Sequence, residues 1–370
     1  MVKILFTRFP LESIPNGGAE RQVMLLATGL AKRGHDVSFA GNCEALGPAF
    51  KASGVKVVDL AIGAPPVSKA GIVAFALKKK MMKAALERML DGFKKLDVIV
   101  MLSLTEKLLL TDVAAGRGIT VIWIEHDPVG RWLTKNPWKK LLRTQSELAT
   151  TVTVSELSRV QYLEMDWNPK KTVAIPNGIA DEWFAEKRKT KKKDDALHLG
   201  YVGRLAEEKG VDVLLRAIAD IDHVTLDVVG DGPEQHALRK QADKLGLGHR
   251  VRFLGRTNDV SHVYNVIDAL VLPSRTIDPF GMVVAEAMVR GVPCIVTDAC
   301  GIASCLEAAR DVLVVKQDNV DALVEGIQSL QDEEKRTLLS KNGAKAARQQ
   351  FAVSTMVDRY ETLFTGKPRQ

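Results

Sequence analysis

Near its N-terminus the chain reads VKILFTRFPLESIPNGGAERQVMLLATGLAKRGHDVSFA over residues 2–40. The apolar run Val2–Phe6 is typical of a buried parallel strand. The pair Gly17-Gly18 indicates a turn, and Ala19–Lys32 has the apolar spacing of an amphipathic helix. A second strand is predicted at Val37–Ala40. This segment therefore predicts a strand–helix–strand unit with parallel strands, from which doubly wound α/β sheets are built.

The first half of the chain continues this pattern. Helical stretches such as Phe75–Lys95 separate four further strand-like runs, namely Val55–Leu60, Val98–Leu102, Ile119–Ile124 and Thr151–Val154. We therefore predict an N-terminal α/β domain over residues 1–177, which the C-terminal helix at 353–370 is expected to complete.

A lysine-rich segment, Glu186–Asp195, interrupts this pattern and predicts a basic linker over residues 178–196. A second α/β domain is predicted over residues 197–352. Its expected elements are strand Leu197–Val202, helix Val211–Ala219, strand Val224–Val229, helix Glu234–Leu245, strands Val251–Leu254 and Ala269–Pro273, helix Gly281–Arg290 and strand Pro293–Thr297. We expect the two domains to face each other, so that the carboxyl ends of both sheets border a central cleft that binds ligands.

Composition excludes several classes of protein. The chain has 370 residues, of which 46% are apolar and 26% charged, which is typical of a globular protein. No apolar run approaches the roughly 20 residues of a membrane span, and the N-terminus lacks the pattern of a signal peptide. Reduced, mostly buried thiols are expected instead of a zinc site, because no paired spacing links the cysteines Cys43, Cys294, Cys300 and Cys305. These features favour the cytoplasm.

The net charge of +7 fits a phosphate-bearing ligand, a nucleic acid or an anionic membrane surface. Aromatic residues make up only 5% of the chain and no nucleic-acid-binding module is recognised, so we expect no nucleic-acid partner. The Rossmann-like halves leave a nicotinamide-dependent oxidoreductase as a remote alternative. The strand Val2–Phe6 lacks the glycine-rich turn that such an enzyme requires, which argues against it.

Two carboxylates lie close together in the segment 273–288, which reads PSRTIDPFGMVVAEAM. Asp278 precedes a predicted helix, and Glu286 lies about two turns further on, roughly on the same side. Backbone N–H groups at the start of this helix could bind a phosphate or sugar, and Gly281 allows close approach. The alternative is a capping carboxylate at Asp278 and a solvated Glu286.

A second group of charged residues follows the predicted strand Leu197–Val202. Arg204 and Lys209 lie in the loop after it, where two cations could hold a diphosphate and stabilise the charge of a departing nucleotide. Taken alone, they could also be surface charges. The acidic pair Asp220 and Asp222 lies at the opposite, amino edge of the sheet, so we expect no metal site.

The order and spacing of several short segments resemble those of the large family four of retaining glycosyltransferases, which has the two-domain GT-B fold with Rossmann-like halves. The resemblance covers nearly the whole chain. It rests on residues 17–21 (GGAER), 34–37 (GHDV), 154–155 (VS), 175–179 (IPNGI), 202–205 (VGRL) with Lys209-Gly210, 229–233 (VGDGP) and 278–286.

The resemblance implies a role for each matching residue. Arg204 and Lys209 would bind the donor diphosphate, and Glu286 the ribose hydroxyls. Asp278 and the backbone of Phe280, Gly281, Met282 and Val283 would bind the sugar and the distal phosphate, while the base would meet backbone near Phe253–Arg256. The family usually has two glutamates where this chain has Asp278 and Glu286. Because aspartate is one methylene shorter, donor preference is expected to differ.

The first half would supply the remaining contacts. His126, after the strand Ile119–Ile124, would contact the donor sugar near the reacting carbon; the alternative is a structural histidine bonded to Asp127. Gly17 and Gly18 would bring backbone N–H groups near the donor phosphate or an acceptor hydroxyl.

The resemblance implies metal-independent transfer, with retention, from a nucleotide diphosphate sugar. We expect a UDP-sugar rather than a GDP-sugar, carrying a hexose or N-acetylhexosamine, and no cofactor. The expected acceptor is a saccharide or lipid-linked saccharide in cell-surface glycan or glycolipid assembly. Alternatives are a soluble enzyme acting on a small acceptor and a nucleotide-sugar hydrolase or epimerase.

A basic amphipathic segment, Lys78–Met89, and the aromatic residues Trp132 and Trp138 suggest contact with a membrane surface. We therefore expect a peripheral position at the inner face of the cell membrane. A solvated helix packed on the sheet is the alternative.

Overall fold

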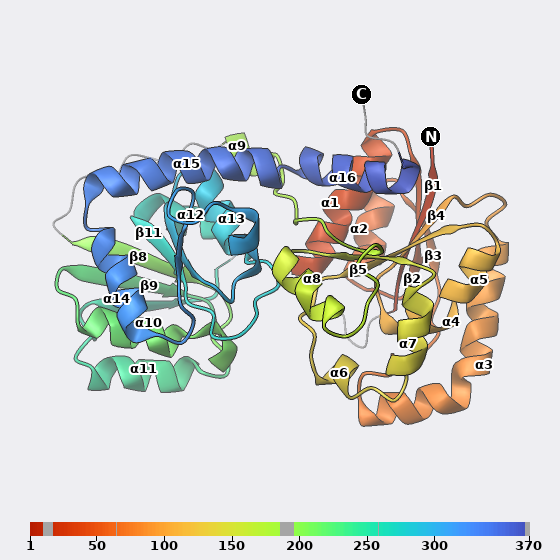
Figure 1. Cartoon of the computed structure of the whole chain (residues 1–370), viewed down its shortest axis with the longest axis horizontal. Coiled ribbons are helices and arrows are strands. Elements are labelled where there is room, and N and C mark those ends of the chain that lie inside the picture. The colour runs from red at the N-terminus through yellow and green to blue at the C-terminus, as the bar shows by residue number, and fades with distance from the viewer. Residues whose placement is uncertain (10–17, 64, 186–195, 258, 367–370) are drawn as a thin grey trace. The chain divides into compact units, whose positions relative to one another are not determined.

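The computed structural model describes residues 1–9, 18–63, 65–185, 196–257 and 259–366 (Figure 1). The chain divides into two compact units. Unit 1 comprises Met1–Gly178 and Val353–Gln370, and unit 2 comprises Ile179–Ala352. The lysine-rich segment 186–195 lies outside the described residues. Residues 179–185, which the sequence placed in the linker, are part of unit 2.

Unit 1 contains a seven-stranded parallel sheet with the order β3-β2-β1-β4-β5-β6-β7. Its strands are β1 (Lys3–Arg8), β2 (Asp36–Gly41), β3 (Lys56–Asp59), β4 (Val98–Met101), β5 (Thr120–Glu125), β6 (Thr150–Thr153) and β7 (Thr172–Ala174). Its helices are α1 (Gly18–Lys32), α2 (Leu46–Ala52), α3 (Lys69–Asp91), α4 (Leu104–Leu109), α5 (Thr111–Gly116), α6 (Arg131–Thr134), α7 (Lys139–Ser146), α8 (Glu156–Leu163) and α16 (Val353–Thr365).

Helices cover both faces of this sheet, so its central strands β1, β4 and β5 each contain an uninterrupted apolar run. Ile4 and Phe6 of β1 point into a core shared with α1 and α16, whereas Leu5 points into the core beneath α3 and α4. This alternation is the period of two expected of a strand. The uninterrupted apolar run near the N-terminus is thereby explained.

Unit 2 contains a six-stranded parallel sheet with the order β10-β9-β8-β11-β12-β13. Its strands are β8 (Leu197–Val202), β9 (Val224–Val229), β10 (Val251–Gly255), β11 (Ala269–Leu272), β12 (Cys294–Thr297) and β13 (Leu313–Val315). Its helices are α9 (Glu182–Ala185), α10 (Val211–Ala219), α11 (Gln235–Lys244), α12 (Val260–Val266), α13 (Met282–Val289), α14 (Val320–Ser329) and α15 (Glu333–Phe351), with the 3-10 turns η1 (Glu207–Lys209) and η2 (Gly301–Cys305).

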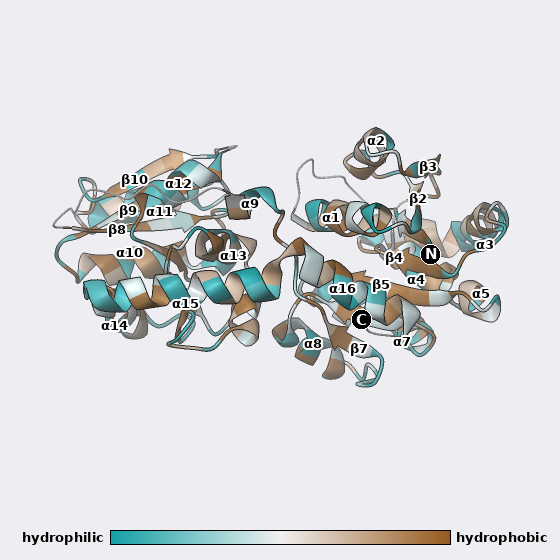
Figure 2. Cartoon of the chain, turned by 90° about the horizontal axis from the view of Figure 1, so that it is seen from above, coloured by the Kyte–Doolittle hydropathy of each residue, from teal (hydrophilic) through white to brown (hydrophobic). Residues whose placement is uncertain are grey.

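The predicted α/β class is confirmed in both units. Figure 2 shows the hydropathy of α15 changing between teal and brown along its length, as expected of a helix with one face on a core. None of the helices within the described ranges has the length and apolar character that a membrane crossing demands. All four cysteines are free thiols, and three of them are buried.

Candidate functional site

The point where the direction of winding reverses in unit 2 lies between β8 and β11. From β8 the chain continues to β9 on one side, and from β11 it continues to β12 on the other. Open α/β sheets bind ligands at the carboxyl ends of the strands flanking such a point. The segments leaving these two strands are residues 203–209 and 273–281, which contain the charged residues singled out from the sequence.

Glycines allow the backbone to pack tightly at this edge. Gly210 has φ +67°, and a Cβ atom there would lie 2.1 Å from the carbonyl oxygen of Pro273. Gly230 has φ +136°, and its Cβ would lie 1.8 Å from the carbonyl oxygen of Gly203. A side chain at either position would force the strand-end loops apart.

Lys209 and Asp278 form an ion pair. The Lys209 Nζ atom lies 2.6 Å from Asp278 Oδ2, and the side chains are 24% and 11% exposed. Asp278 is held by its backbone, which donates to Ala299 O at 2.9 Å and accepts from Gly301 N at 2.8 Å. Asp278 is therefore not the capping carboxylate that the sequence left open, because Gly281 occupies the N-cap of α13.

Glu286 is buried in α13 rather than solvated. The buried hydroxyl of Tyr264, in α12, donates a hydrogen bond of 3.2 Å to Glu286 Oε2. Burial, and then the charge of Glu286, raise the pKa of Tyr264 well above its usual value, so this hydroxyl remains a donor. The pair fixes the orientation of a carboxylate in the second turn of α13.

The segment before α13 runs alongside the loop after β12. Ile302 N donates to Phe280 O at 2.7 Å, and Gly281 has φ +93°. The helix begins at Met282, and the N–H of Val284 donates to the carbonyl of Gly281 at 3.0 Å. First-turn N–H groups such as that of Val283 have no acceptor within their own helix, which suits an anionic ligand.

Arg204 and Arg256 are both exposed at the same edge. The Arg204 side chain is 66% exposed and lies 3.6 Å from Glu208, while its carbonyl accepts a 2.8 Å bond from the Tyr201 hydroxyl. Arg256 follows β10 directly. Unlike Lys209, Arg204 reaches into solvent.

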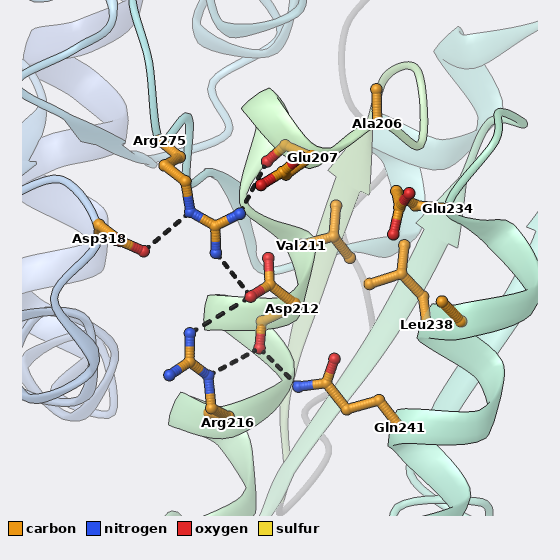
Figure 3. A pocket seen from close by; sticks show the side chains of 11 residues that line it. Ala206, Glu207, Val211, Asp212, Arg216, Glu234, Leu238, Gln241, Arg275 and Asp318 are labelled. Atoms are coloured by element: carbon orange, nitrogen blue, oxygen red, sulfur yellow. Dashed lines mark hydrogen bonds and ion pairs between the residues drawn. The ribbon is translucent and has the colours of Figure 1, made fainter.

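Arg275 anchors the turn that contains Lys209 (Figure 3). Its guanidinium contacts Asp212 Oδ2 at 2.6 Å and Asp318 Oδ1 at 2.9 Å, and donates to Glu207 O at 3.1 Å. Its backbone N–H also donates to Glu208 O at 2.9 Å. These bonds tie η1 to the loop after β11. They border a polar cavity of about 610 Å³ between η1, α10 and α11.

Unit 1 also gathers charge at its own winding reversal, between β1 and β4. Arg8, the last residue of β1, pairs with Glu20 of α1. Lys107 of α4 lies 2.8 Å from Glu125 Oε1 and donates to Ile124 O at 3.2 Å. These bonds hold the end of β5, immediately before His126.

The His126 side chain is half-buried, but its Nε2 atom is buried and has no hydrogen-bond partner within the described ranges. Burial, with further contributions from Arg8 and Lys107, lowers the pKa of His126 to about 3. The imidazole is therefore neutral at physiological pH. A structural bond from Nε2 to Asp127, the alternative raised from the sequence, is absent.

Two further observations complete the sequence-derived set. Gly18 is exposed at the start of α1, while Gly17 lies outside the described residues. The aromatic residues Trp132 and Trp138 pack against the core of unit 1, Trp138 with its ring 5.1 Å from that of Phe75.

Sequence reasoning missed Tyr264 and Arg275 as residues that shape the site. Arg275 lay within a segment already singled out, between Pro273 and Asp278, but its partners Asp212 and Asp318 are far away in sequence. Tyr264 lies 22 residues before Glu286, with no local pattern linking the two. Only the folded chain brings these groups together.

Comparisons with known proteins agree with this geometry. Residues 16–183 match the family described as Glycosyltransferase Family 4, and residues 183–346 match Glycosyl transferases group 1. An uncharacterized glycosyltransferase of Haemophilus influenzae is 27% identical over 358 residues, covering 94% of this chain and 96% of that protein. The lipopolysaccharide core biosynthesis glycosyltransferase LpsD of Rhizobium meliloti is 33% identical over 171 residues, covering 46% of this chain and 50% of LpsD.

The fold is shared with the crystal structure of Anabaena HepE in complex with UDP. That structure has a TM-score of 0.80 at 20% identity and covers 99% of this chain and 100% of HepE. Together, the two adjoining family matches and this likeness identify the chain as a family-four-like glycosyltransferase with the GT-B fold.

Proposed function

We propose that the chain transfers a hexose or N-acetylhexosamine from a nucleotide diphosphate sugar to a saccharide or lipid-linked acceptor, with retention at the anomeric carbon. The observation that carries this proposal is the ion pair of Lys209 and Asp278 at the winding reversal of unit 2, followed by the buried carboxylate of Glu286 in α13. A cation, a carboxylate suited to sugar hydroxyls and a carboxylate suited to ribose are the groups that such a donor requires. The match to LpsD supports a place in cell-surface glycan assembly.

Each residue has a proposed task. Lys209 and Arg204 bind the diphosphate, Glu286 accepts from the ribose hydroxyls, and the first turn of α13 receives the distal phosphate. Arg256 and the end of β10 border the base, for which we favour uracil because the HepE structure contains UDP. We assign the neutral His126 to orienting the donor sugar, as a hydrogen-bonding group rather than as an acid. The backbone N–H of Gly18 is assigned to the donor phosphate or the acceptor hydroxyl, and Gly17, which the sequence grouped with it, lies outside the described residues.

In the proposed reaction, the bond between the anomeric carbon and the distal phosphate oxygen breaks. The acceptor hydroxyl oxygen bonds to the same carbon from the face that the nucleotide leaves, and its proton passes to the departing phosphate. Two side-chain cations balance the charge that develops on this phosphate, which a divalent ion does in other enzymes. The reaction as proposed therefore requires no metal.

A thermal-shift screen against UDP-, GDP- and ADP-sugars in EDTA tests the donor assignment. A ligand at 100 times its dissociation constant stabilises the folded state by about 2.7 kcal/mol. We expect one nucleotide to raise the melting temperature of wild type, and Lys209→Met and Glu286→Gln to lose that shift. Lys240→Met, which removes an exposed charge from α11, should retain it. The donor assignment is wrong if no nucleotide sugar stabilises wild type.

Reaction assays separate the transferase from its alternatives. Release of free sugar at the full rate without an acceptor would favour a hydrolase, and interconversion of the donor sugar would favour an epimerase. Turnover with a small soluble acceptor alone would favour a soluble enzyme. We expect an added saccharide or lipid-linked saccharide to accelerate donor consumption, with retention of anomeric configuration visible by NMR.

We further propose that unit 1 rests on an anionic membrane surface through α3. The side chains of Val73, Leu77 and Met81 are 59%, 80% and 61% exposed. Because they are four residues apart, they form one stripe along the helix. Exposed lysines, Lys78 and Lys80, lie beside the stripe. An apolar stripe bordered by cations suits the headgroup region of an anionic bilayer.

Vesicle flotation tests this surface. Wild type is expected to float with vesicles of phosphatidylglycerol and phosphatidylcholine at low salt, and Leu77→Asp to remain in solution. Leu338→Asp in α15 is the matched control, because Leu338 is an equally large apolar side chain that is 59% exposed in unit 2. Equal flotation of the two variants would show that the α3 stripe is not the contact.

A further inference from the structure

Lys209, the cation that we assign to the donor diphosphate, is already engaged in an ion pair with Asp278. At 2.6 Å, Lys209 Nζ is in direct contact with Asp278 Oδ2, and Ser274 Oγ lies 3.5 Å from the same oxygen. Both side chains are largely shielded from water, so the pair is not one of the loose surface contacts that contribute little. Arg204, by contrast, is mostly exposed.

Both partners lie on segments that the fold holds in place. Lys209 N donates to Ala206 O at 2.9 Å, and Gly210, whose φ of +67° ends η1, packs directly on Pro273. The backbone N–H and carbonyl of Asp278 both form hydrogen bonds with the loop after β12. The backbone therefore fixes the two positions from which these side chains meet.

A phosphate oxygen and a carboxylate oxygen are chemically similar partners for an ammonium group. We propose that Asp278 stands in for the donor phosphate on Lys209 when no donor is bound, and that donor binding exchanges this contact. Asp278 is then released and accepts hydrogen bonds from hydroxyls of the sugar. This inference rests on the proposed function.

The exchange makes Asp278 a specificity-determining residue. A nucleoside diphosphate takes Lys209 but has no sugar hydroxyl for Asp278, so a shielded carboxylate is left without a partner. A nucleotide sugar satisfies both groups. The chain therefore disfavours the bare nucleoside diphosphate, which is the product of transfer, relative to the donor.

Titration calorimetry in EDTA tests the exchange, with UDP and UDP-glucose as probes, or GDP and GDP-mannose if the donor screen selects GDP. Asp278→Asn removes the competing charge and frees Lys209. We expect UDP to bind this variant about tenfold more tightly than wild type, while UDP-glucose binds no more tightly. Asp278→Glu, which keeps the carboxylate, is expected to retain the wild-type preference for UDP-glucose. Asp278→Ser gives the same comparison if Asp278→Asn does not fold.

Asp222→Asn is the matched control. Asp222 is exposed between α10 and β9, at the amino edge of the sheet, so its neutralisation reports the general effect of removing one negative charge from unit 2. If Asp278→Asn changes UDP affinity no more than Asp222→Asn, the exchange is wrong while the donor assignment stands. If neither probe binds wild type or Lys240→Met, the donor assignment itself fails.

Discussion

Protonation of His126 is expected to make the free energy of unfolding of unit 1 depend on pH. In the folded chain its pKa is lowered to about 3 by burial, whereas an unfolded histidine titrates near 6.5. Between these values the unfolded state binds more protons, so stability falls as the pH drops below about 6.5. We expect His126→Gln to lose this dependence. The difference in unfolding free energy between wild type and variant should shrink by up to about 1.4 kcal/mol per pH unit towards pH 4.5.

Chemical denaturation at several pH values measures that difference. The comparison between variants matters because Glu106, also in unit 1, contributes with the opposite sign. Burial raises the pKa of Glu106 to about 7, so its protonated form favours the folded state between about pH 4.5 and 7, and this contribution is lost as the pH rises. Parallel pH profiles for wild type and His126→Gln would contradict an imidazole that stays neutral in the folded chain.

The sequence singled out some residues of the candidate site but not the residues that contact them. Lys209, Asp278 and Glu286 were recognisable because they belong to short segments whose order and spacing resemble those of the glycosyltransferase family. The residues that contact them were not recognisable in this way. The pairing of Lys209 with Asp278 spans 69 residues, and that of Arg275 with Asp212 spans 63, so both depend on how β8 and β11 lie side by side. The hydrogen bond from the Tyr264 hydroxyl to Glu286 likewise joins residues 22 positions apart.

At the level of elements, Gly281 sets the start of α13. Its φ of +93° is unfavourable for other residues, and a Cβ atom there would lie 2.7 Å from Cys300 Sγ and 3.2 Å from Leu272 Cδ2. We expect Gly281→Ala to lower the unfolding free energy of unit 2 by about 2–4 kcal/mol, from backbone strain and overpacking together. Denaturant titration followed by circular dichroism measures this loss.

Two further variants separate these contributions. Gly246 has φ +68° and open space where a Cβ would lie, so Gly246→Ala reports the strain alone. The double change Gly281→Ala with Cys300→Ala removes the contact with sulfur and should recover part of the loss. If Gly246→Ala and Gly281→Ala are equally destabilising, packing against Cys300 contributes nothing.

Elements with a strong apolar pattern were predicted closely. The strand expected at Val98–Leu102 is β4 (Val98–Met101), and that expected at Leu197–Val202 is β8. The helix predicted from Phe75 begins earlier, at Lys69, where the Ser68 side chain caps it. The strands β7 and β13 were missed because each has only three residues, too few for a recognisable pattern.

For the whole molecule, the sequence predicted two α/β units because the strand–helix alternation occurs twice. It could not define where the chain passes from one unit to the other, since composition marks only the lysine-rich segment. In the structure the chain passes between units after Gly178 and again after Ala352. Gln22 fixes the first of these points on unit 1, where its side chain donates to Gly178 O at 2.9 Å and accepts from Gly178 N at 2.8 Å.

The second passage makes unit 1 depend on the last helix of the chain. Helix α16 buries Met356, Val357 and Tyr360 against the sheet and α1, beside which it lies in both whole-chain views (Figures 1 and 2). A Cβ at Gly29 of α1 would lie 2.6 Å from Val357 Cγ2, so the two helices touch closely. Arg33 adds an ion pair with Asp358 at 2.6 Å.

We therefore expect a chain that ends after Ala352 to lose at least about 4 kcal/mol of stability in unit 1, since each large buried side chain contributes about 1.5–3 kcal/mol. Unit 2 should keep its own stability, because α16 belongs to unit 1, while Phe351, which packs on Phe280, stays in the truncated chain. Hydrogen exchange measures both outcomes: amides of β1, β2 and α1 should exchange faster in the truncated chain, and those of β8 and β9 at the original rate. A chain ending after Gly366 is the control. Faster exchange in both units alike would mean that α16 supports the whole chain rather than unit 1 alone.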